Sequence, residues 1–114
     1  MIKFTIALRR RQGMTHDEFV QYHRERHAPL FSSLPEVTRF VRRYVQCHPT
    51  AETLPGLSDS KIDGTTELWF DDLAVLVALF TSQGYMEKIR PGELNFLDFN
   101  SCEFLIGTEN PVIA

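Results

Sequence analysis

The chain has 114 residues, and that length predicts one domain spanning residues 1–114. Its 43% hydrophobic and 24% charged residues are typical of a soluble globular protein and argue against a disordered or fibrous one. No apolar run approaches the roughly 20 residues that a membrane-spanning helix needs. The first 13 residues also lack the apolar core of a secretion signal. We therefore expect a cytoplasmic protein that makes no contact with membranes.

The net charge is −3, but the charges are unevenly distributed along the chain. Residues 1–48 hold nine Lys and Arg against four Asp and Glu, whereas residues 49–114 hold three against eleven. The basic cluster at residues 9–11 has no interleaved aromatic residues of the kind that stack on nucleic-acid bases. We therefore disfavour nucleic-acid binding and expect the two halves to pair with each other, within one chain or across a dimer.

The first two expected elements are a strand and a helix. Apolar residues alternate with others over residues 2–9, which predicts a strand with one buried face. Thr15 and Glu18 have the spacing of a capping box, which predicts that a helix begins at about residue 16. Pro29 lacks a backbone N–H and disfavours helix at the preceding residue, so we expect this helix to end or kink at Ala28.

The middle of the chain predicts two strands and a second helix. Residues 37–48 are rich in β-branched and aromatic residues, which favours a strand, and residues 49–64 contain the Pro, Gly and Ser of a long loop. Residues 65–71 predict another strand. Asp71 or Asp72 can then cap a helix that carries an apolar face.

The last third predicts one further strand. Gly84, Pro91 and Gly92 break the region after the second helix, and residues 93–99 favour one short helical turn. Residues 101–109 read as the closing strand. The resulting order is β-α-β-β-α-β, which predicts an α+β, ferredoxin-like antiparallel sheet in the order 4-1-3-2 with both helices on one face.

Cys47 and Cys102 then fall on strands at opposite edges of the sheet, so we expect two free thiols. The sheet face that points away from the helices carries a mixture of apolar and charged residues: Ala7, Val41, Val45, Trp69 and Leu105 with Arg43, Glu67 and Glu103. An exposed apolar patch of this kind is unusual on a monomer. We expect a homodimer that closes two such sheets face to face.

The first helix offers the most informative pattern. At about 100° per residue, the apolar stripe contains both His23 and His27, so both imidazoles should point at the sheet. Three interpretations remain open for them. They can be ordinary core residues with satisfied nitrogens, they can bind a metal, or they can be neutral acid–base groups in a pocket. Metal binding is the least favoured, because no third and fourth ligands are evident.

Aromatic residues are candidates for the wall of such a pocket. The expected helix-facing side includes Phe4, Phe70 and Tyr44, and a buried Tyr hydroxyl needs a hydrogen-bond partner. Tyr22 and Tyr85 are further candidates. We expect these five residues to bind a small hydrophobic or aromatic ligand. The sequence contains no phosphate loop and no flavin or nicotinamide fingerprint, so no organic cofactor is expected.

The segments "LRRRQGMTHDEFVQYHRERHAPL", "LPEVTRFVRRYVQCH" and "DGTTELWFDDLAVLVALF" resemble the EthD domain family. The resemblance implies a dimeric α+β barrel built from ferredoxin-like protomers, with a pocket between sheet and helices. The family pattern matches His27, in "HAPL". At His23 the family more often has tryptophan, and "RPGELNFLDF" lacks the Asp expected before Glu93.

The family is named for a component of an ether-degrading cytochrome system. Relatives in its fold group include cofactor-free monooxygenases, polyketide cyclases and dehydratases. The resemblance therefore implies an enzyme, either an oxidoreductase or a cyclase or dehydratase, that acts on an aromatic or polyketide-like metabolite. We expect His27 to be the base, His23 to assist it, and Tyr22 and Tyr44 to polarise a carbonyl group. The alternative is a non-catalytic protein that binds a ligand in an oxidative pathway.

Overall fold

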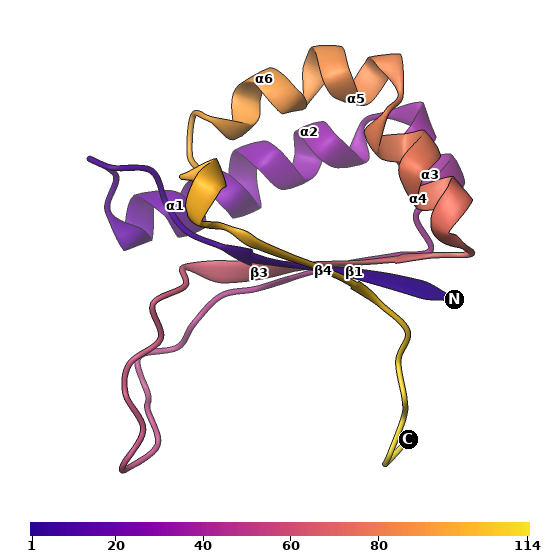
Figure 1. Ribbon diagram of the computed structural model, residues 1–114. Helices are drawn as coiled ribbons and strands as arrows, with labels where there is room; N and C mark the ends of the chain where they lie inside the picture. The colour runs from indigo at the N-terminus through magenta and orange to yellow at the C-terminus, as the bar shows by residue number, and fades with distance from the viewer.

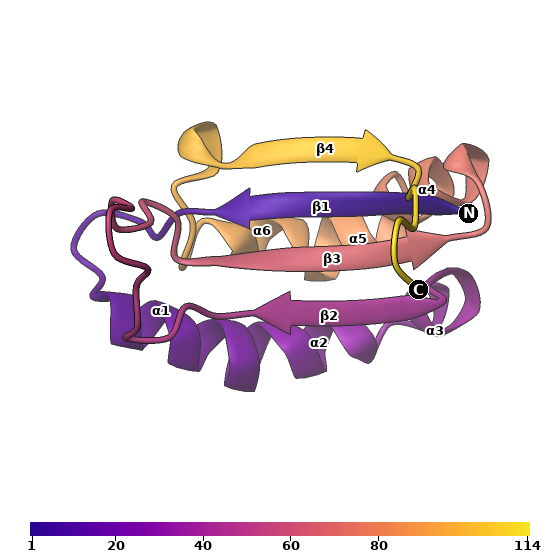
Figure 2. The same ribbon diagram turned by 90° about the horizontal axis from the view of Figure 1, so that it is seen from below.

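The computed structural model describes residues 1–114 and contains one four-stranded antiparallel sheet in the order β2-β3-β1-β4. The strands are β1 (Ile2–Leu8), β2 (Arg43–Cys47), β3 (Gly64–Phe70) and β4 (Glu103–Gly107). All the longer helices lie on one face of this sheet, and both chain termini leave it at the same end (Figures 1 and 2). The ferredoxin-like strand order expected from the sequence is confirmed.

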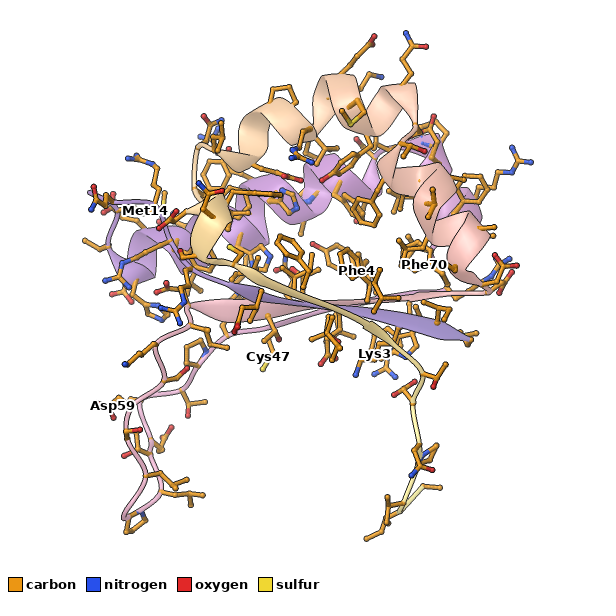
Figure 3. The ribbon with its side chains drawn as sticks, in the orientation of Figure 1. Lys3, Phe4, Met14, Cys47, Asp59 and Phe70 are labelled. Carbon is orange, nitrogen blue, oxygen red and sulfur yellow. The ribbon has the colours of Figure 1, made fainter.

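The register of the sheet decides which side chains face the helices. Phe4 on β1 lies opposite Leu68 on β3 and Ile106 on β4. Side chains alternate between the two faces of a strand, so Phe4 and Phe70 rise toward the helices whereas Lys3 and Cys47 point away (Figure 3). The sheet therefore has an inner face that forms the core and an outer face without helices.

The first helix is longer than expected. It consists of α1 (His16–Tyr22), a π-helical turn η1 (His23–His27) and α2 (Ala28–Ser32). Of the two outcomes expected at Ala28, an end or a kink, the end does not occur, and the helix instead continues through an irregular, π-helical turn. The backbone N–H of Ala28 bonds to the carbonyl of His23, five residues back, and this wider turn accommodates Pro29 in the first turn of α2. Both candidate histidines lie within this turn.

A further helix, α3 (Pro35–Phe40), replaces the first part of the strand expected over residues 37–48. Pro35 suits the first turn of a helix, and Val37 is buried in the core, so the proline and the packing override the β propensity of this segment. The sequence placed Val41 on the outer face of the sheet. In the structure Val41 instead packs against the core on the helix side.

The second half of the chain has three short helices, where one was expected. They are α4 (Leu73–Phe80), α5 (Gln83–Lys88) and α6 (Arg90–Glu93), followed by the 3-10 turn η2 (Phe99–Ser101). Asp72 caps α4 through the backbone N–H of Val75 at 2.9 Å. Contrary to the expectation from the sequence, Gly84 does not interrupt helical structure but lies inside α5. A Cβ at this position would approach a Glu36 carboxylate oxygen to 3.0 Å. It lets α5 pack closely on α3.

The basic and acidic halves of the chain pair with each other, as expected. Arg10 binds Asp63 at 2.6 Å, and Arg42 binds Asp71 at 2.7 Å. Asp63 is buried and anchors the base of the loop between β2 and β3 to the end of β1. Both cysteines are free.

The outer face is partly covered by polar groups of the same chain. Trp69 is only 7% exposed because the cations of Lys3 and Arg43 lie over its ring, and its Nε1–H donates to Glu109 at 2.6 Å. Leu105 on the same face is 64% exposed. No helix of the chain is long and apolar enough to cross a membrane.

The Thr15 capping box predicts a measurable contribution to stability. The Thr15 hydroxyl accepts from the Glu18 N–H at 3.1 Å, and the Glu18 carboxylate accepts from the Thr15 N–H at 3.0 Å. Thr15→Ala should lower the free energy of unfolding by about 1 kcal/mol. Urea denaturation would measure this change. Thr53→Ala, in the exposed loop, is the matched control and should change little; equal effects of the two substitutions would contradict the role of the cap.

Candidate active site

A cavity of about 230 Å³ lies between the inner face of the sheet and the helices. Thirteen of its 18 lining residues are hydrophobic. Pockets for drug-sized ligands are roughly 300–1,000 Å³, so this one fits a small apolar molecule. Five lining residues are polar or charged, and two of the hydrophobic ones, Tyr44 and Tyr85, carry a hydroxyl group; the five are His23, His27, Thr66, Arg90 and Glu93.

His27 presents an unpartnered imidazole to the cavity. Its ring lies 5.0 Å from that of Phe96 and 5.9 Å from that of Phe31, measured between ring centroids. Neither ring nitrogen has a hydrogen bond to protein. Burial lowers the pKa of His27 from 6.5 to about 4. The ring is therefore neutral near pH 7, and one of its nitrogens has a free lone pair.

His23 has the opposite character, because both of its nitrogens are satisfied. Nδ1 shares a hydrogen bond with Nε2 of His48 at 2.9 Å, and Nε2 shares one with Oγ1 of Thr66 at 3.1 Å. The residue is 1% exposed. Burial, with smaller effects of the neighbouring His27 and His48, lowers its pKa to about 3. His23 thus stays neutral and joins the first helix to β3 and to the end of β2.

Tyr44 supplies a hydroxyl group on the sheet side of the cavity. Its oxygen accepts a hydrogen bond from Nε2 of Gln46 at 2.9 Å, which leaves the hydroxyl proton free to donate to a ligand. Burial raises the pKa of Tyr44 to about 12, so this proton is retained at neutral pH. Gln46 also donates to the carbonyl of His23 at 2.9 Å and so fixes Tyr44 relative to the π-helical turn.

A buried carboxyl group lines the cavity on the side of α6. Glu93 is 7% exposed, and burial raises its pKa above the usual value of 4.5. Its Oε1 accepts a hydrogen bond from the Tyr85 hydroxyl, whose own pKa is raised by burial and by the Glu93 charge. The other oxygen, Oε2, has no hydrogen bond and lies 3.6 Å from the Arg90 guanidinium. Burial thus favours the protonated form of this carboxyl group, while the Tyr85 hydrogen bond and the Arg90 charge favour its ionised form.

The structure brings together most of the residues that the sequence singled out. His23, His27, Phe4, Tyr44 and Tyr85 all line the cavity. Two candidates do not line it. Tyr22 stacks on the far side of Phe96 at 4.8 Å, and Phe70 is packed into the core beyond the cavity. The roles of all seven stay predictions.

Sequence reasoning did not select Glu93, Thr66 or His48 for the site. Alternation along β3 places Thr66 on the same face as Leu68 and would have found it. Glu93 belongs to a four-residue helix that has no visible periodicity, so no sequence signal placed its side chain inward. His48 follows the end of β2 and reaches His23 only because the strand edge and the helix meet there. No group of three or more His, Cys, Asp and Glu side chains is placed to hold a metal ion.

These features define a small ferredoxin-like α+β protein with an apolar cavity under its helices. The family model of the EthD domain matches residues 11–100. The chain belongs to the EthD domain family.

Comparison with curated proteins finds Dehydratase aurZ of Gibberella zeae, which is 25% identical over 116 residues, spanning 94% of this chain and 76% of that protein. Among solved structures, an EthD family protein of Bacillus halodurans matches with a TM-score of 0.69 at 19% identity, covering 96% of this chain and all of that one. A dimeric ferredoxin-like protein of unknown function from Bacteroides fragilis matches with a TM-score of 0.65 at 12% identity, covering 95% of each chain. These structures support the fold.

The lowered pKa values of the two histidines predict a loss of stability in acid. As the pH falls from 6.5 toward 4, the unfolded chain binds protons at His23 and His27, whereas the folded chain stays largely unprotonated at both until the pH nears 4. The free energy of unfolding should therefore fall by roughly 3 kcal/mol per histidine. Glu93 acts in the opposite direction. Because its pKa is raised in the folded state, its contribution to the free energy of unfolding becomes more favourable as the pH falls.

Comparing the wild type with His27→Gln at each pH cancels the contribution of Glu93 and most of that of His23, whose pKa is lowered chiefly by burial and less by His27. Urea denaturation at pH 7, 5.5 and 4.5 should show a shallower fall in stability for the variant. Equal slopes would contradict a neutral, buried His27.

Proposed function

We propose that the protein is a cofactor-independent dehydratase that acts on a small aromatic or polyketide-like β-hydroxy carbonyl compound. One observation supports this most directly: a neutral imidazole without a partner, His27, and a buried carboxyl group that favours its protonated form, Glu93, line the same apolar cavity. A base and an acid poised in opposite protonation states are what elimination of water requires.

In the proposed reaction His27 removes a proton from the carbon next to the carbonyl group. The electron pair of that C–H bond forms the C=C double bond as the β C–O bond breaks. Glu93 gives its proton to the departing hydroxyl group, which leaves as water. His27 then gives up a proton and Glu93 takes one up, which restores both groups, so the cycle is balanced without a cofactor.

The Tyr44 hydroxyl would stabilise the enolate that develops during this reaction. Its free proton can donate to the carbonyl oxygen while Gln46 holds the ring in place. The apolar wall strengthens each of these interactions by excluding water. Cyclisation and cofactor-free oxygenation would use the same base. Dehydration is favoured because the acid Glu93 expels a hydroxyl group, and because the curated relative from Gibberella zeae is named a dehydratase.

The activity can be tested with 4-hydroxy-4-phenylbutan-2-one, an aromatic β-hydroxy ketone whose dehydration gives a conjugated enone with strong ultraviolet absorbance. The wild type should accelerate the appearance of the enone. His27→Gln and Glu93→Gln should each lower the rate by about 100-fold or more, because general acid–base groups contribute roughly 10²–10⁴. His16→Gln, outside the cavity, is the matched control and should retain the rate.

Binding of the ketone without turnover would contradict the dehydratase proposal. It would support instead the alternative of a non-catalytic, ligand-binding protein of an oxidative pathway. Under that alternative His27→Gln would change only the affinity for the ketone.

We also propose that two chains pair through the outer faces of their sheets. The exposed Leu105 and the cations around Trp69 lie on this face, and the long loop and the C-terminal segment both project on the same side of the sheet (Figure 1). One structural relative is described as dimeric. A second copy would cover the patch by a two-fold contact.

The dimer predicts a mass of two 13.2 kDa chains in light scattering. Leu105→Glu, which places a charge on the outer face, should shift the protein toward the monomer. Leu94→Glu should leave the dimer intact, because Leu94 lies on the helix side. Leu94 is 68% exposed and Leu105 is 64% exposed, so the two substitutions are matched. A wild type that measures as one chain at micromolar concentration would contradict this arrangement.

A further inference from the structure

The hydrogen bonds of His23 continue beyond the cavity wall. Thr66 lines the cavity, His23 is buried behind it, and His48 is partly exposed at the end of β2. We propose that Thr66, His23 and His48 form a proton relay that connects the cavity with solvent. The relay deepens the proposed function and rests on it for its use, but its existence can be tested without any substrate.

The geometry forms one unbroken chain of donors and acceptors. Oγ1 of Thr66 lies 3.1 Å from Nε2 of His23, and Nδ1 of His23 lies 2.9 Å from Nε2 of His48. The His23 imidazole is bridged through both of its nitrogens, which is the arrangement that lets a ring accept a proton at one nitrogen while it releases another, and His48 is joined to it through Nε2. The rings of His23 and His48 meet edge to face, with centroids 5.1 Å apart.

An outward pass moves one proton from the cavity to water. Thr66 accepts a proton from a donor in the cavity and gives its own hydroxyl proton to Nε2 of His23. His23 releases its Nδ1 proton to Nε2 of His48, and His48 releases its Nδ1 proton to water. His23 is a neutral ring before and after the transfer, so its low basicity does not prevent the transfer.

After an outward pass each donor of the relay has become an acceptor and each acceptor a donor. The three residues are then ready to carry a proton inward. His48 then takes a proton from water and donates its Nε2 proton to His23, whose Nε2 proton passes to Thr66. A dehydration releases one proton from carbon and consumes one at the hydroxyl group. One outward and one inward pass therefore match one turnover and return the relay to its starting state.

Two further features support a built connection rather than a chance contact. Gly64 on β3 allows His48 its position, because a Cβ there would lie 2.9 Å from the Cys47 carbonyl oxygen and 3.2 Å from the His48 ring. Two cations face His48, namely Arg24 and, when protonated, His16, and with burial they lower its pKa. An imidazolium at His48 would therefore give up its proton to water readily.

The relay predicts how quickly the ring proton of His23 exchanges with water. In the full-length protein with ¹⁵N-labelled histidine rings, NMR can measure this exchange without ligand. His48→Gln keeps an amide oxygen that can accept from Nδ1 of His23 but cannot pass a proton on, so exchange should slow at least ten-fold at an unchanged melting temperature. Gly64→Ala displaces His48 without changing a titratable group and should slow the exchange in the same direction.

Two further variants test the relay. His16→Gln, in which the altered histidine binds Asp63 and acts on His48 only through its charge, should slow the exchange far less than His48→Gln does. Thr66→Val removes the hydroxyl group that supplies a proton to Nε2 of His23, so it should slow the exchange as His48→Gln does. Wild-type exchange rates in both His48→Gln and Gly64→Ala, or in Thr66→Val, would overturn the relay. Either result leaves the ketone test of the dehydratase proposal unaffected, so the two can fail separately.

Discussion

The burial of His23 between the first helix and the sheet is the contact on which the site depends. Its ring reaches Thr66 on β3 and His48 after β2, so the helix is held to the strands by hydrogen bonds at this point and not by apolar packing alone. A buried imidazole without partners would be costly, which makes both bonds necessary. The π-helical turn that contains His23 then places His27 on the same side, facing the space that remains open.

The apolar wall of the cavity acts on its titratable groups in opposite directions. Burial disfavours every charged form, so it keeps His27 unprotonated and favours the protonated form of Glu93. Both pKa shifts are in the direction that acid–base catalysis of an elimination needs. The same few aromatic residues that close the cavity, Phe96 and Phe31 among them, therefore also set its chemistry.

The fold could be predicted from the sequence because period-two and period-3.6 patterns report directly which faces are buried. The strand order and the inward direction of His23 and His27 followed from those patterns. The errors occurred where tertiary contacts override local preference, as at Pro29, where a π-helical turn carries the helix onward. Glu93 could not be found, because its orientation is set by Tyr85 across a helix break and not by any repeat along the chain.

The spacing of the two histidines suggests a matched pair, yet their surroundings make them different. Their rings stack at 5.8 Å, but His23 has two hydrogen-bond partners and His27 has none. A ring with both nitrogens engaged is poorly suited to attack a carbon acid, since its lone pair is already used. A ring with no partner has its lone pair available but no fixed route by which to lose a proton to water. In the proposed reaction the arrangement would separate the two tasks of a proton-transfer site, with the acceptor at His27 and the connection to solvent at His23.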